Sequence, residues 1–158
     1  MKLLILFLSF LTATSFAAPA DRDGDLGLGV MVGDTTSLTG KYWTESDRGW
    51  DLSGGASEEK EGWLQASYLK HYIGAFGAGT RFIGESTPYA GLGLGMGFNR
   101  TQDAIKRQND YFARIPLGLS WMPNRTPVDL FAEVAPTYIF SPGGVVYLSG
   151  NVGGRYYF

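Results

Sequence analysis

The sequence predicts an all-β fold, a single closed, antiparallel, up-and-down barrel of about eight strands. Apolar residues alternate with small or polar residues at a period of two, and turn-rich connections separate these segments. Glycine is abundant, at 23 of 158 residues, and 15% of the residues are aromatic, yet no apolar run beyond the N-terminus approaches the length of a transmembrane helix. An even number of strands lets a single-chain barrel close with both ends of the chain on one side.

The N-terminus has the layout of a cleavable signal peptide. A positive start at residues 1–2 precedes an apolar run over residues 3–11 and a small-x-small cleavage site at residues 18–20. The run is too short to cross about 30 Å of hydrocarbon as a helix, and charged residues follow at once. We therefore expect residues 1–20 to be removed, with cleavage after Ala17 as an alternative, and residues 21–158 to form one domain.

The alternation assigns eight strands to the chain. The expected strands are residues 26–32, 37–44, 50–56, 63–68, 90–98, 111–121, 128–138 and 146–158. Polar, glycine-rich or proline-rich connections lie between them, at residues 33–36, 45–49, 57–62, 99–110, 123–127 and 141–144. Residues 70–84 fit either a long strand or a strand end with a turn, and we expect a turn at residues 84–88.

Residue size indicates which face of the strands points outward. A soluble eight-stranded barrel, such as a lipocalin, turns its apolar face inward, and a membrane barrel inverts this. Here the face opposite the large aliphatic residues is mainly glycine and small polar residues, which suits a narrow interior. The aliphatic face also carries aromatic residues near strand ends, as at membrane interfaces: Tyr42, Trp50, Tyr111, Trp121, Tyr138, Tyr156 and Phe158. We therefore expect a transmembrane barrel, whose strand edges must all be paired in hydrocarbon.

Five charged residues fall on the small-residue face of the predicted strands. They are Lys41, Asp51, Arg114, Glu133 and Arg155. A single charge without water is costly, so charges that share a narrow lumen should pair. The sequence therefore predicts a polar network inside the barrel.

The C-terminal residues resemble the signal that the outer-membrane barrel assembly machinery reads. Gly153, Tyr156 and Phe158 match the pattern of a glycine, then aromatic residues two apart, with the last at the end of the chain. Val152 departs from the pattern, since a polar residue is usual there. The resemblance implies that the assembly machinery is a partner of this chain.

Most of residues 25–158 resembles a family of small outer-membrane β-barrels of spirochaetes and other diderm, Gram-negative bacteria. The resemblance is carried by residues 38–43, 131–136 and 154–158. It implies a β-barrel fold, an outer-membrane location and membrane lipids as surroundings. Because members of the family are largely uncharacterised, it implies little about activity.

Catalytic and metal-binding patterns are sparse. The chain has one histidine, His71, and no cysteine. Ser67 lies four residues before His71, which is about 13 Å along an extended strand and too far for direct contact. We therefore interpret His71 as a polar residue at a strand end and predict no catalytic residue. Glu58, Glu59 and Glu61 fit a solvated loop, so we predict no metal and no cofactor.

The favoured function is that of a non-enzymatic outer-membrane barrel, structural or surface-binding, with a plugged lumen. Three alternatives stay open: a narrow pore for small solutes beside the glycines of residues 90–98, a lipid-modifying enzyme using His71, and a soluble periplasmic ligand-binding barrel.

The chain has no basic stripe, which argues against nucleic acid as a binding partner. We expect a monomer, with the connections at residues 33–37, 57–62, 99–110 and 141–144 outside the cell and those at 45–49, 84–88 and 123–127 in the periplasm.

Overall fold

The computed structural model describes residues 23–34, 36–56, 60–77, 80–99, 109–124, 126–140 and 144–158. Strands dominate them, together with one short helix, α1 (Arg81–Gly84). The strands are β1 (Leu26–Gly33), β2 (Ser37–Glu45), β3 (Arg48–Gly55), β4 (Lys60–His71), β5 (Ser86–Asn99), β6 (Asn109–Arg114), β7 (Leu117–Trp121), β8 (Val128–Ile139) and β9 (Val145–Tyr157). The predicted signal peptide, residues 1–20, lies outside the described residues, as do Glu58 and Glu59.

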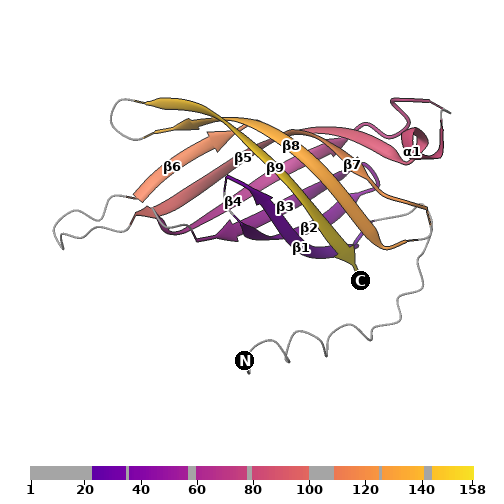
Figure 1. Ribbon diagram of the computed structural model, residues 1–158, viewed down its shortest axis with the longest axis horizontal. Coiled ribbons are helices and arrows are strands. Elements are labelled where there is room, and N and C mark those ends of the chain that lie inside the picture. The colour runs from indigo at the N-terminus through magenta and orange to yellow at the C-terminus, as the bar shows by residue number, and fades with distance from the viewer. Residues whose placement is uncertain are drawn as a thin grey trace, which may run out of the picture.

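The sheet closes on itself. All the strand pairs are antiparallel and, apart from β6 and β7, consecutive strands pair with each other. β1 also pairs with β9, so that Leu28 faces Tyr156 across the seam. Figure 1 shows the strands running obliquely around a long barrel. The predicted fold, a closed antiparallel barrel of eight strands, is confirmed, because β6 and β7 together form one barrel strand. A closed sheet has no free edge that would need other partners.

The sixth barrel strand is interrupted, where the sequence predicted one continuous strand over residues 111–121. The break falls at Ile115 and Pro116, because proline has no amide hydrogen to give to a neighbouring strand. Hydrogen bonds nevertheless continue across the break, since the Ile115 amide donates to the Pro136 carbonyl (3.0 Å) and the Pro116 carbonyl accepts from Gly91 (2.9 Å). Both β6 and β7 therefore lie between β5 and β8.

The region between β4 and β5 corrects the sequence analysis. The turn predicted at residues 84–88 is wrong, since β5 begins at Ser86 and Ser86 and Pro88 pair with Trp121 and Leu119 of β7. Residues 86–88 are two hydroxyl residues followed by a proline, a composition that is typical of turns. Pro88 fits the strand because its carbonyl still accepts from the Tyr72 amide, at 2.9 Å.

The barrel has an apolar outside and a polar inside. Leu92, Leu148 and Leu38 are 70%, 67% and 65% exposed on the outer face, whereas Thr39, Ser67 and Thr137 are buried on the inner face. The prediction that the aliphatic face points outward is thus confirmed for the described strands. This arrangement is the reverse of the lipocalin-like alternative.

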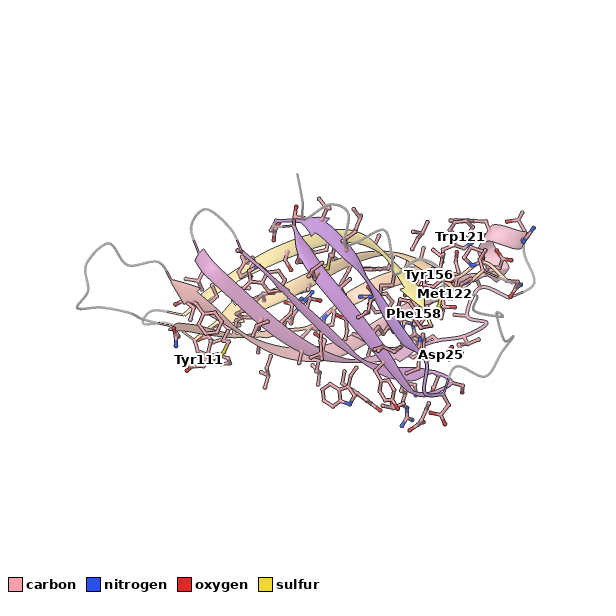
Figure 2. All side chains as sticks on the ribbon, turned by 90° about the horizontal axis from the view of Figure 1, so that it is seen from below. Asp25, Tyr111, Trp121, Met122, Tyr156 and Phe158 are labelled. Carbon is pink, nitrogen blue, oxygen red and sulfur yellow. The ribbon has the colours of Figure 1, made fainter. Side chains whose placement is uncertain are left out.

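The two ends of the barrel differ. Figure 2 places Asp25, Trp121 and Phe158 at one end, which we call the proximal end, and Tyr111 at the other, the distal end. Helix α1 lies at the proximal end, outside the barrel wall (Figure 1). In the described part of the chain, no helix is long and apolar enough to cross a membrane.

Candidate functional site: the barrel interior

Arg155 is the centre of the largest polar cluster inside the barrel. Strand β9 points its guanidinium inward, where it forms ion pairs with Asp51 of β3 and, at 3.3 Å, with Asp129 of β8. Its Nε and Nη2 also donate to Oγ1 of Thr39, at 3.1 and 2.9 Å. The ring of Phe131 lies 3.9 Å from the guanidinium carbon. The cation is fully buried, and two carboxylates, a hydroxyl and an aromatic face surround it.

A separate ion pair joins two neighbouring strands of the wall. Arg114 of β6 donates to the carboxylate of Glu133 of β8, and both side chains are buried. The Tyr89 hydroxyl of β5 donates to the other Glu133 oxygen, at 3.1 Å. A carboxylate that accepts from two buried donors is well satisfied, which makes it costly to remove.

Lys41 and His71 form a third polar contact near the proximal end. The Lys41 ammonium donates to Nε2 of His71, at 2.5 Å, and lies 4.1 Å from the ring centroid of Trp43. The His71 ring packs between Trp43 and Tyr89, with centroid distances of 4.7 and 5.0 Å. His71 is the last residue of β4, as predicted, but its side chain is 1% exposed and packs inside the barrel.

Among the described residues inside the barrel, the charges balance because of Asp129, which the sequence analysis did not include in the network. The five predicted residues, all buried here, carry three positive and two negative charges, and Asp129 supplies a third negative charge. Its carboxylate is completely buried and accepts hydrogen bonds from Ser120 and, at 3.3 Å, from Tyr157. One signal in the sequence could have found it, since Asp129 is four residues before Glu133 and so shares its strand face.

The glycines of the inner face provide slots for aromatic rings. A Cβ on Gly153 would lie 2.5 Å from the ring of Phe131, and one on Gly27 would lie 2.6 Å from the ring of Tyr157. Gly95 and Gly118 are approached still more closely, by the rings of Phe112 and Tyr89 respectively. The interior is thus filled by rings that need a neighbour without a side chain.

At three glycines of β5, neighbouring groups lie in the space that the sequence suggested for a pore. Gly95 receives Phe112, a Cβ on Gly93 would clash with Ser67 and Arg114, and one on Gly91 would clash with Leu69. Apolar and aromatic side chains fill the proximal end as well, where Trp43, Met122 and Tyr157 pack together.

The C-terminal residues lie at the seam where the barrel closes. Gly153 faces the interior against Phe131, whereas the rings of Tyr156 and Phe158 lie on the outer face in edge-to-face contact, 5.2 Å apart. The Phe158 amide donates to the Leu26 carbonyl at 3.1 Å, which ties the last residue to β1.

The candidate catalytic residues Ser67 and His71 both lie on β4 with buried side chains. His71 contacts Lys41, Trp43 and Tyr89. Within the described ranges, no group of three or more acidic or histidine side chains is arranged to hold a metal ion.

Comparison with known proteins supports the fold. No protein-family model matches the chain, and no curated protein matches it. In structure, the chain is similar to the N-terminal β-barrel domain of Pseudomonas aeruginosa OprF, known from a crystal structure. The TM-score is 0.63 over 87% of this chain and 99% of that domain, with 16% sequence identity. At this identity the likeness shows the barrel fold, and the family resemblance of the sequence stays a prediction.

Proposed function

We propose that this protein is an integral outer-membrane barrel with a structural or surface-binding role, and that its interior is packed shut. The observation that carries the proposal is the distribution of its residues, with aliphatic side chains outside and paired charges inside a closed sheet. Such an exterior is unfavourable in water and suited to hydrocarbon.

Aromatic residues at both ends of the outer face support a membrane location. Tyr42 and Trp50 are exposed near the proximal end, and Tyr111 and Tyr138 near the distal end. Amphipathic rings favour the headgroup layer, so two such levels match the two interfaces of a bilayer. In this placement the proximal end faces the periplasm and the distal connections face outward.

Cell fractionation tests the location. The chain should appear in the outer-membrane fraction, and unheated samples should migrate differently from boiled samples in a denaturing gel, because closed membrane barrels resist detergent until heated. Recovery from the soluble periplasm without detergent would refute the membrane location.

The packed interior supports a barrel that does not conduct. The ion pair between Arg155 and Asp51 joins β9 to β3, past β1 and β2, and the buried rings of Phe112, Phe131 and Tyr89 occupy the interior that a pore would need. In planar bilayers we expect no steady single-channel current from the wild type. The variant Phe112→Ala/Phe131→Ala, which removes two of these rings, is the control expected to leak. Steady current steps from the wild type would instead support the pore alternative.

The surroundings of His71 support a structural role over a catalytic one. Its Nε2 is held by the Lys41 ammonium and its ring by Trp43 and Tyr89. Expression of the protein should leave the lipid A of the host unchanged. A lipid change that disappears with His71→Ala, while the barrel still folds, would assign an enzyme.

A further inference from the structure

The connection between β4 and β5 carries many exposed apolar side chains. We define it as residues 72–77 and 80–85, which include α1. Its large apolar side chains are between 41% and 64% exposed: Tyr72, Ile73, Phe76, Phe82 and Ile83. A cluster of this kind on the surface indicates a binding partner.

Hydrogen bonds hold this connection in a fixed position. The Ser86 hydroxyl donates to the Phe82 carbonyl at 2.7 Å, which ties α1 to the start of β5. The side-chain carboxylate of Glu85 accepts a hydrogen bond from the backbone amide of Asn124 at 3.1 Å. The backbone carbonyl of Glu85 accepts one from the amide of Met122, also at 3.1 Å. The helix is therefore attached to the wall of the barrel and to the β7–β8 connection.

The apolar surface of the connection continues the apolar outer face of the barrel. The ring of Phe82 packs on Trp121, with centroids 5.5 Å apart, and Trp121 is the last residue of β7. Figure 2 shows Trp121 beside α1 at the proximal end. A surrounding layer that covers the outer face of the barrel beside Trp121 would therefore also contact the β4–β5 connection.

Two cations accompany these apolar side chains. The Arg81 side chain donates through Nε to the Glu85 carboxylate at 3.0 Å and is still 76% exposed. Lys70, the last residue but one of β4, is exposed, with its ammonium 6.0 Å from the ring centroid of Tyr72. Long cationic side chains beside aromatic rings are typical of the layer where acyl chains meet phosphate groups. This composition, together with continuity with the wall, favours phospholipid over a protein as the partner.

We propose that the β4–β5 connection is a lipid-binding segment that lies in the interfacial layer of the periplasmic leaflet. Its apolar side chains enter the upper acyl region, and Arg81 and Lys70 reach the phosphate groups of phospholipids, as in an interfacial amphipathic segment. This inference rests on the proposed membrane location.

The absence of cysteine from the sequence permits a direct test. A single cysteine replaces Ile83 and carries an environment-sensitive fluorophore, and the protein is folded into vesicles of phosphatidylethanolamine and phosphatidylglycerol. Two matched controls are Leu94→Cys, which is 66% exposed on the outer face of β5, and Thr126→Cys, in an exposed proximal turn. Phe76→Cys is a second position in case Ile83→Cys does not fold.

We expect the Ile83 label to show a blue-shifted emission and stronger quenching by lipids brominated near the headgroup than by lipids brominated near the chain end. The Leu94 label should be quenched by deeper bromines, and the Thr126 label should resemble a label in water. If the Leu94 label enters lipid while the Ile83 label behaves like Thr126, the inference fails and the proposed function stands. If neither label enters lipid, the proposed function fails. A shift at Ile83 that disappears on dilution into excess lipid would point to a second protein copy and overturn the inference.

Discussion

The Arg114–Glu133 pair is a residue-scale test of the interior network. Glu133→Ala leaves the buried Arg114 cation without its carboxylate, which typically costs about 3–5 kcal/mol of stability. Unfolding by denaturant in detergent micelles, followed by tryptophan fluorescence, should show this loss. Glu45→Ala is the matched control, because its pair with Arg48 is solvent-exposed and worth only about 0–1 kcal/mol.

The double variant Arg114→Met/Glu133→Leu separates the net contribution of the ion pair to stability from the cost of leaving one buried charge unpaired. Replacing both charges by apolar groups of similar size is often neutral, so this variant should be more stable than Glu133→Ala. It should stay somewhat below the wild type, because the buried Tyr89 hydroxyl also loses its acceptor. Equal stability of Glu133→Ala and the wild type would contradict the network.

The glycine slots make a second prediction at the residue scale. Gly95→Ala places a methyl group against the ring of Phe112, and overpacking of this kind typically costs about 1–3 kcal/mol. Gly150→Ala is the control, because a Cβ there meets nothing within 4 Å. The same denaturant titration compares the two variants. If both variants lose the same stability, the loss at Gly95 comes from the backbone conformation of glycine and not from its packing against the ring.

Single residues also show how far sequence reasoning reaches. The face of each strand residue follows from the alternation, which is why the sequence assigns Lys41 and Arg155 to the inner face; both side chains are buried. The partner that each side chain selects depends on which strands become neighbours and on side-chain rotamers. The pairing of Arg155 with Asp129 and the burial of His71 therefore became visible only in the structure.

At the scale of elements, the anchoring of α1 should depend on pH. The hydrogen bond from Arg81, and after it the bond from the Asn124 amide, lower the pKa of Glu85 below its ordinary value of 4.5. The carboxylate thus contributes stability that is present above pH 4.5 and is lost as the pH falls through the lowered pKa.

The variant Glu85→Gln measures this contribution. Its melting temperature should be below that of the wild type at pH 6, and the gap should close as the pH is lowered toward 3. Differential scanning calorimetry in micelles, with both proteins at each pH, measures the gap. A gap that stays constant over this range would show that ionisation of Glu85 plays no part.

Element boundaries were predicted well where period two was uninterrupted and poorly beside proline. The first three strands differ by at most two residues from their predicted ends, because their alternation is regular. Pro116 divided a strand expected to be continuous, and Pro88 concealed the start of β5. In both cases the hydrogen bonds of neighbouring strands override the local preference of the residue.

At the scale of the whole molecule, the barrel closes by joining its first and last strands. Phe158 donates to Leu26 across this seam, and its ring packs on Tyr156 at the outer face of the barrel. The C-terminal residues could thus act in two separable ways, as part of the closed sheet and as the segment that the assembly machinery binds. The sequence pattern favours a role in assembly, because closing the sheet requires only the backbone of Phe158 and not its ring.

Phe158→Ala distinguishes these two roles, because it keeps the backbone hydrogen bond and removes the ring. If the ring is read during assembly, the variant should accumulate much less in the outer membrane of cells, while its refolding into detergent micelles and its unfolding midpoint should match the wild type. Val146→Ala, which removes an exposed apolar side chain from β9, the strand that Phe158 follows, is the control for lost lipid contact. A variant that is unstable in micelles would make Phe158 a structural residue of the seam, and normal accumulation in cells would remove the basis for an assembly signal here.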